Sequence, residues 1–180
     1  MKKTLVCMAL AAGLVAAVRA EEASFQLSLV PDVALCDTTD TITFLALNVW
    51  GMNPQHSLTI GLINGSYGKS SGVTLGAVNY TADNYSGVQA GMVNFVYSDF
   101  AGIQVACLNY VSDECLGVQF GFANYAGRLK GFQFGFLNMA AQADRGLQIG
   151  LVNLMPETRT WFAPGTSDVA PVMVLANWRF

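Results

Sequence analysis

Residues 117–125 read GVQFGFANY, and the same nine-residue pattern recurs at 87–95 (GVQAGMVNF), 102–110 (GIQVACLNY), 131–139 (GFQFGFLNM) and 146–154 (GLQIGLVNL). Weaker copies begin at Thr41 (TITFLALNV), Ser57 (SLTIGLING) and Gly72 (GVTLGAVNY), so the chain carries eight copies, and the five strong ones follow one another at a period of 15 residues with one step of 14. A period of this length indicates one structural unit that is repeated along the chain. The repeat therefore decides the architecture before any single residue does.

Each copy alternates with a period of two, which predicts a β-strand. Positions two, four and six of the nine are apolar in every copy, and position five is small in seven of eight. One face is therefore apolar, and the other carries a polar row at position three: Thr43, Thr59, Thr74, Gln89, Gln104, Gln119, Gln133 and Gln148. Position eight is always asparagine: Asn48, Asn64, Asn79, Asn94, Asn109, Asn124, Asn138 and Asn153.

The N-terminus predicts a secretory signal peptide over residues 1–20, with Lys2 and Lys3 before an apolar stretch and a small-residue cleavage site before Glu21. Residues 21–180 are then one repeat-built β domain, with the eight copies at 41–154 and a strand at each end, 25–30 and 171–180. After cleavage six basic residues face twelve acidic ones, with no basic run. Nucleic acid is therefore not expected as a partner.

Two architectures accommodate the repeat. Nine straight strand residues cover roughly 30 Å, and a six-residue connector spans at most about 20 Å. This length argument favours an antiparallel up-and-down meander over a parallel β-solenoid of 15-residue period. The solenoid stays open if each strand bends at its glycines into sides of about five residues. It would stack the glutamines and the asparagines into ladders.

The meander also matches a transmembrane β-barrel. Membrane-crossing strands are about 9–11 residues long and alternate apolar with polar or small positions. The eight copies and the two end strands would make ten strands, an even number as in bacterial barrels. The two longest connectors, 31–40 and 155–170, would then both lie on the outer side. The sequence thus predicts an all-β, roughly ten-stranded, closed transmembrane β-barrel.

Two resemblances point to the bacterial surface. The alternating C-terminal strand that ends in Phe180 looks like the assembly signal of outer-membrane barrels. The copies over residues 72–154 resemble bacterial surface-repeat proteins with GxQxGxxN repeats, first noted in spirochaetes. These resemblances imply a location in the outer membrane or at the cell surface, and no particular activity.

Candidate chemistry is sparse. His56 is the single histidine, with Ser57 adjacent and Asp83 or Asp99 as carboxylates that a Ser–His site would need. The spacing does not enforce such a site, so we expect a solvated histidine and no enzyme. We expect no metal or cofactor site, because no Cys/His spacing and no phosphate-binding loop occurs. Cys107 and Cys115 could pair across a turn; otherwise Cys107 is a small apolar residue of its strand.

The polar row could line a narrow lumen, but a closed, hydrogen-bonded core is favoured because buried amides must be paired. The asparagines are expected to be structural. The predicted function is that of a small outer-membrane barrel with a structural or surface-interaction role. It would contact membrane lipid and could meet an extracellular partner through residues 31–40 and 155–170. The alternatives are a secreted or periplasmic β-solenoid for binding or adhesion, a narrow pore, and a lipid-modifying barrel enzyme.

Overall fold

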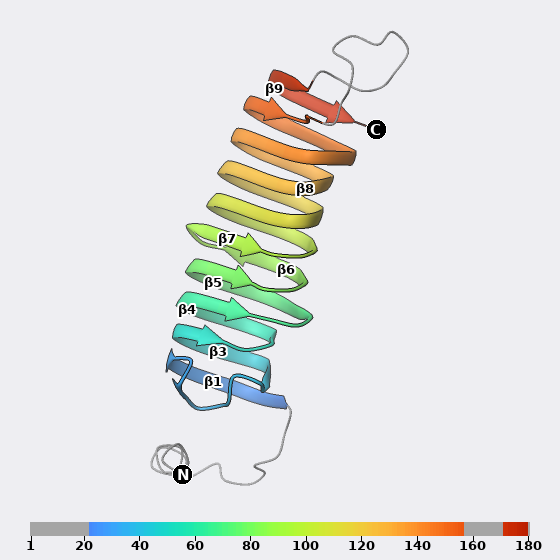
Figure 1. Cartoon of the computed structure of the whole chain (residues 1–180). Helices are drawn as coiled ribbons and strands as arrows, with labels where there is room; N and C mark the ends of the chain where they lie inside the picture. Colours follow the sequence, from blue (N-terminus) through green and yellow to red (C-terminus); the bar gives the residue numbers. More distant parts are fainter. Residues whose placement is uncertain (1–21, 157–170, 180) are drawn as a thin grey trace.

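The computed structural model describes residues 22–156 and 171–179 and shows an elongated stack of β-coils, drawn in Figure 1. The predicted signal peptide and most of the connector 155–170 lie outside the described residues. The strands are β1 (Glu22–Val30), β2 (Val33–Ala34), β3 (Thr41–Met52), β4 (His56–Ser66), β5 (Ser70–Thr81), β6 (Tyr85–Ala90), β7 (Val93–Val96), β8 (Phe100–Leu154) and β9 (Val172–Arg179). No helix occurs in this part of the chain.

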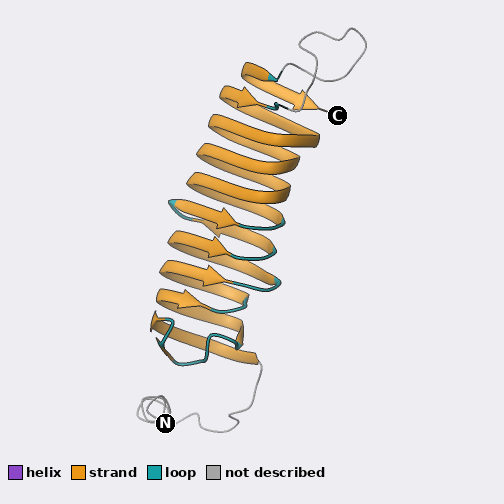
Figure 2. Ribbon diagram, viewed as in Figure 1, coloured by secondary structure: helices purple, strands orange, loops and turns teal. Residues whose placement is uncertain are grey.

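The chain is a β-solenoid, so the prediction of a closed barrel of antiparallel strands is wrong. Neighbouring strands from β3 to β8 are parallel, and each residue lies beside its counterpart one repeat later. Gly72 of β5 pairs with Gly87 of β6, which in turn pairs with Gly102 of β8. β8 runs continuously through several coils, and Figure 2 shows it as strand throughout. The alternative of a 15-residue solenoid describes this arrangement.

A short connector can return the chain to the next coil because the repeat is not one straight strand. β6 ends at Ala90 and β7 begins at Val93, so the chain bends at Gly91–Met92, around position five of the copy. A second bend falls at position one, where Gly117 has a φ of 145°. A Cβ atom on Gly117 would stand 2.0 Å from the carbonyl oxygen of Gly102 in the preceding coil. Glycine thus allows both the turn and the close stacking of coils.

The first coil is built by residues that sequence analysis treated as a separate end strand. β1 pairs in parallel with β3, and Gln26 lies beside Ala46, which lies beside Thr59. Gln26 and Ala46 therefore occupy position three of their coils. The nine-residue pattern of this coil therefore begins three residues later than the copy predicted at 41–49. Its position three is Ala46, and Thr43 is exposed on the outside. The segment Phe25–Ser28 does match the apolar–Gln–apolar–small pattern, and that match could have revealed the extra coil.

Both ends of the stack carry antiparallel strands. β2 pairs with β1 at one end, and β9 pairs with the last coil of β8 at the other, with Asn177 beside Gln148. Open sheet edges invite pairing with other chains. Residues 31–40 also contact the first two coils: the N–H of Cys36 donates to Gln26 Oε1 at 3.0 Å, and Asn53 Nδ2 donates to the carbonyl oxygens of Asp37 at 2.8 Å and Asp40 at 3.1 Å. The caps therefore cover what would be the exposed edges of the solenoid.

Candidate functional site

The interior of the solenoid is lined by amide side chains rather than by a purely apolar core. The position-three glutamines are buried and hydrogen-bonded from coil to coil. Gln104 Nε2 donates to Gln89 Oε1 at 2.9 Å, and Gln119 Nε2 donates to Gln104 Oε1 at 2.9 Å. Gln133 and Gln148 continue the series at 2.7 and 2.8 Å. Thr59 and Thr74 are buried at the same position of the earlier coils, whereas Thr43 is not.

The asparagines form a second interior ladder. Asn94 Nδ2 donates to Asn109 Oδ1 at 2.9 Å, and Asn109 Nδ2 donates to Asn124 Oδ1 at 2.9 Å. Asn109 Nδ2 also donates to the carbonyl oxygen of Phe120 in the next coil at 2.8 Å. The buried members of this ladder, each hydrogen-bonded to its neighbours, are Asn64, Asn79, Asn94, Asn109, Asn124, Asn138 and Asn153. Asn48 is half-buried and donates to Asn64 Oδ1 at 3.2 Å.

The bend at position five explains how positions three and eight both point inward. A straight strand would place them on opposite faces, because their spacing is odd. The bend reverses this parity, so that a glutamine row and an asparagine row face the same interior. The two ladders donate in opposite directions along the axis, since each glutamine donates to the preceding coil and each asparagine to the following one.

Large side chains fill the remaining interior. Tyr85 and Phe100 are buried and stack with ring centroids 6.2 Å apart. The Tyr85 hydroxyl lies 2.7 Å from Thr74 Oγ1. Burial raises the pKa of Tyr85 to about 12, against a smaller opposing effect of the hydrogen bond to Thr74. The polar row therefore belongs to a packed, hydrogen-bonded core in the described residues.

The residues proposed for a Ser–His site do not converge. His56 Nδ1 lies 2.7 Å from Ser71 Oγ, while Ser57 faces inward and its Oγ lies 3.2 Å from Thr59 Oγ1. Asp83 Oδ2 accepts from the backbone of Gly68 at 2.6 Å. The register places the coil of Asp99 three coils beyond His56, roughly 14 Å along the axis at a strand spacing of about 4.8 Å. No orienting carboxylate therefore stands beside His56 in the way that nucleophilic catalysis requires.

Cys107, in the copy 102–110, and Cys115, in the connector that follows it, have different environments. Cys107 is exposed and Cys115 is fully buried, and both are free thiols. Burial, with a smaller contribution from Glu114, raises the pKa of Cys115 to about 12. The suggested pairing of Cys107 with Cys115 is therefore not formed. No cluster of metal-ligating side chains is found within residues 22–156 and 171–179.

Charged side chains gather on one side of the solenoid. Lys130 Nζ lies 2.8 Å from Glu114 Oε2 and 3.5 Å from Asp144 Oδ2, and Arg128 joins the same carboxylates at 3.8 and 3.9 Å. The hydrogen bond to Glu114 raises the pKa of Lys130. A groove of about 590 Å³ lies next to this cluster, between Lys130 and Leu147. Lys130 and Asp144 line the groove and are paired with each other, and Arg145 lines it as well.

The opposite side of the solenoid is apolar. Position six forms a row that we call the ridge, comprising Leu29, Val49, Leu62, Ala77, Met92, Cys107, Phe122, Phe136 and Leu151. Positions two and four form the first wall beside it, which includes Ile103, Val105, Phe120, Phe132 and Ile149. Positions seven and nine form the second wall, which includes Ile63, Tyr80, Phe95, Leu108, Tyr110, Tyr125 and Leu137.

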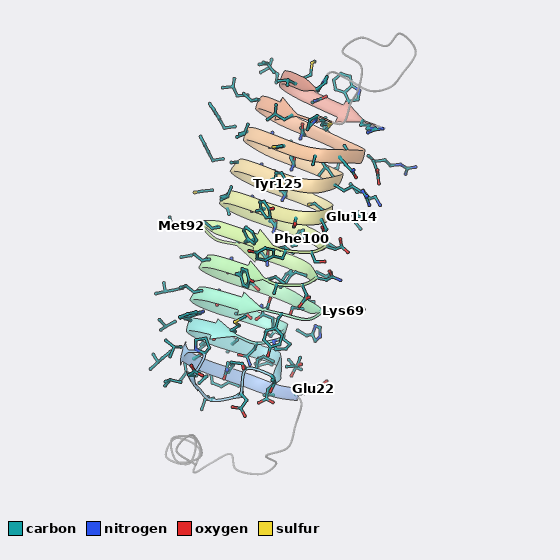
Figure 3. All side chains as sticks on the ribbon, viewed as in Figure 1. Glu22, Lys69, Met92, Phe100, Glu114 and Tyr125 are labelled. Atoms are coloured by element: carbon teal, nitrogen blue, oxygen red, sulfur yellow. The ribbon has the colours of Figure 1, made fainter. Side chains whose placement is uncertain are left out.

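The ridge protrudes beyond both walls. Its large side chains from Leu29 to Leu151 are 45–64% exposed, whereas the exposed side chains of the first wall between Leu58 and Ile149 are only 37–44% exposed. Between Leu45 and Leu154, positions two to nine contain no charged residue and no histidine in any coil. Figure 3 places Met92 of the ridge at one edge of the stack, and Lys69 and Glu114 at the opposite edge. The molecule is therefore polar inside, apolar along one edge and charged along the other.

Comparison of the chain with protein-family models, characterised proteins and solved structures found no match. The resemblance to spirochaete-type surface repeats stays a prediction. Within the described ranges, no helix has the length and apolar character needed to cross a membrane. The apolar edge is the feature of the described molecule that goes furthest beyond the needs of folding.

Proposed function

We propose that this protein is an exported β-solenoid that works as a binding or adhesive surface and not as an enzyme. The observation that supports this most directly is the apolar edge formed by the ridge and the two walls. Side chains on a solvent-facing solenoid surface are free to be polar, because the interior ladders and coil stacking already hold the fold. An uninterrupted apolar strip over this length is characteristic of interaction sites.

The interior supports the same proposal. Its amides are engaged with one another, as the bonds of Gln104 and Asn109 illustrate. The candidate catalytic groups around His56 are spread over different coils. Export is supported by the sequence pattern of residues 1–20, and we place the mature chain at the outer membrane or cell surface on that basis. Residues 31–40 are part of the cap and remain available to a partner on their outer side.

Two measurements test this function. Expressed with residues 1–20, the protein should yield a mature chain that begins at Glu21 and is cleaved by protease added to intact cells. The folded mature chain should also enhance the fluorescence of 1-anilinonaphthalene-8-sulfonate. The ridge substitutions Met92→Glu and Phe122→Glu together should reduce that enhancement severalfold. An uncleaved, protease-protected chain would contradict the export, and an unchanged dye signal would contradict the assignment of the binding surface.

A matched control keeps the comparison specific. Ser86 and Leu116 are both exposed and both lie at the charged edge, one residue before position one of their coils. The double substitution Ser86→Glu and Leu116→Glu adds the same two charges as the ridge variant. Dye fluorescence of this control should stay close to that of the unmodified chain. His56→Ala should likewise leave dye binding unchanged, because His56 lies away from the apolar edge.

A further inference from the structure

The apolar edge is convex, and this shape restricts what can cover it. The ridge is more exposed than the first wall on one side and than Ile63, Leu108 and Leu137 of the second wall, which are 38–41% exposed. The two walls therefore fall away from the ridge on either side. A flat protein surface could cover one wall, or the ridge alone, but not both walls together. A fluid apolar medium can surround a ridge and both of its flanks.

The size of the apolar edge is large for a monomer. The nine ridge residues follow the coil spacing, so the ridge extends roughly 40 Å at about 4.8 Å per coil. Positions two to nine span about 25 Å of chain around the bend at about 3.3 Å per residue. The product is on the order of 1,000 Å², whereas the largest apolar patch of a typical monomer measures about 300–600 Å².

The backbone and the ends of the solenoid are compatible with an apolar surrounding. In a lipid environment each backbone amide and carbonyl must be paired within the protein. Here coil-to-coil pairing covers positions two to four and seven to nine, as in the registers of β6 and β7 with β8, and at the bend the N–H groups of Gly91 and Met92 donate to Val105 O and Ala77 O at 2.9 Å each. β2 pairs with Ser28 and Val30 of the first coil, and β9 pairs with the last coil between Gly146 and Leu154. The glutamines at position three and the asparagines at position eight, which alternate with the wall residues, point inward.

The distribution of aromatic and charged groups gives the direction of insertion. Tyr80, Tyr110 and Tyr125 lie at position nine, the margin of the second wall furthest from the ridge. Tyr110 and Tyr125 stack with centroids 4.7 Å apart. Tyrosine favours the boundary between lipid and water. Glu114 lies at the edge opposite to the ridge (Figure 3) and pairs with Lys130 at 2.8 Å, so this charged cluster would stay in water.

Resting on the proposed function, we propose that the ridge and its walls insert into a phospholipid surface, with the solenoid axis parallel to the membrane plane. The surface is zwitterionic rather than anionic. The mature chain carries twice as many acidic as basic residues, and none of its basic side chains lies on the ridge or walls between Leu45 and Leu154. Attraction therefore comes from apolar burial, so binding does not depend on anionic lipid or on low salt.

Flotation of the mature chain with phosphatidylcholine vesicles tests this inference. The unmodified chain should float with the vesicles at both low and high salt, and anionic phosphatidylglycerol should not increase the bound fraction. The Met92→Glu and Phe122→Glu double variant should bind at least tenfold less. The Ser86→Glu and Leu116→Glu control should float like the unmodified chain. Circular dichroism and urea unfolding establish that the variants being compared are folded.

A second measurement does not depend on the ridge variant. Cys107 lies on the ridge, so an environment-sensitive fluorophore can be attached there in a Cys36→Ser background while buried Cys115 stays unmodified. Its emission should shift to the blue on addition of vesicles and be quenched by brominated phosphatidylcholine. Failure to float, binding that requires anionic lipid, or a label that stays in water would overturn the inference.

A second copy of the chain is the main competing occupant. Sedimentation that shows a concentration-dependent dimer, disrupted by the ridge variant but not by the control, would assign the apolar edge to self-association if vesicles are not bound. In that outcome the dye and export results of the proposed function would still hold. Loss of those results as well would mean that the proposed function itself fails.

Discussion

Replacing Asn109 by leucine tests whether the interior amide ladder holds the solenoid together. Leucine has nearly the shape of asparagine, so the change removes hydrogen-bonding groups with little change of volume. Three interactions end at Asn109: its Nδ2 donates to Phe120 O at 2.8 Å and to Asn124 Oδ1 at 2.9 Å, and its Oδ1 accepts from Asn94 Nδ2 at 2.9 Å.

The expected loss of stability follows from these partners. Three hydrogen bonds at about 1 kcal/mol each, with roughly 2 kcal/mol more for leaving Asn124 Oδ1 without this donor, make about 5 kcal/mol. Asn94 Nδ2 keeps its bonds to Gln89 O at 3.0 Å and Val105 O at 3.3 Å, so it adds no desolvation cost. Burial of leucine returns about 2 kcal/mol. The free energy of unfolding should therefore fall by about 3 kcal/mol.

Urea unfolding followed by far-UV circular dichroism measures this change as a shift of the midpoint at constant slope. Leu108→Asn is the matched control, because the adjacent side chain is 41% exposed on the outer surface. Its effect should stay at about 1 kcal/mol, because only part of the Leu108 side chain is buried. If Asn109→Leu costs no more than this control, or stabilises the chain, the asparagine ladder does not carry the stability that its hydrogen bonds imply.

Three further predictions concern the bends and the buried titratable groups. Gly117→Ala should cost about 3 kcal/mol, since it combines a φ of 145° with a Cβ atom 2.0 Å from Gly102 O; Gly68→Ala should cost only about 1 kcal/mol in the same urea assay, because nothing lies within 4 Å of its Cβ. Stability should fall as the pH rises above 9, because burial raises the pKa of Cys115 from 9.0 and of Tyr85 from 10.0 to about 12. The folded state then retains protons that the unfolded state releases, at about 1.4 kcal/mol per pH unit and group; Cys115→Ala should flatten this fall between pH 9 and 10, and an unchanged slope would contradict it. Cys107 should react with a disulfide reagent in the folded chain, whereas Cys115 should react only in urea; equal reaction rates would show that Cys115 is not enclosed.

The division of the repeat into an apolar and a polar face could be derived from the alternation alone. The apolar residues at positions two, four and six do lie outside, as Leu58, Ile60 and Leu62 show. The same alternation is equally compatible with a barrel wall, where apolar residues face lipid. The barrel was favoured over the solenoid because a six-residue connector is too short to return along a straight nine-residue strand. The strand in each coil is not straight.

The candidate site was only partly accessible from sequence. The glutamines were expected to share one face, whereas the odd spacing of five positions between glutamine and asparagine would put the asparagines of a straight strand on the opposite face. Only the bend at Gly91 or its equivalents brings Gln89 and Asn94 into one interior. The prominence of the ridge is likewise a property of this bend, since a corner exposes the side chain at its apex more than its neighbours.

The sequence by itself determined the repeated β-strand, its 15-residue period, and the absence of charge from positions two to nine. These are local properties, because strand alternation depends on the chemistry of consecutive side chains. The tertiary structure decided that each copy pairs in parallel with the next copy and that the chain bends twice in every repeat. The backbone groups of a strand can bond to a parallel or to an antiparallel neighbour, and glycine at positions one and five accepts either an extended or a bent chain. The choice is made only when coils stack, because stacking joins Gln89 to Gln104 and Asn94 to Asn109 and so satisfies amides that would otherwise be buried without partners.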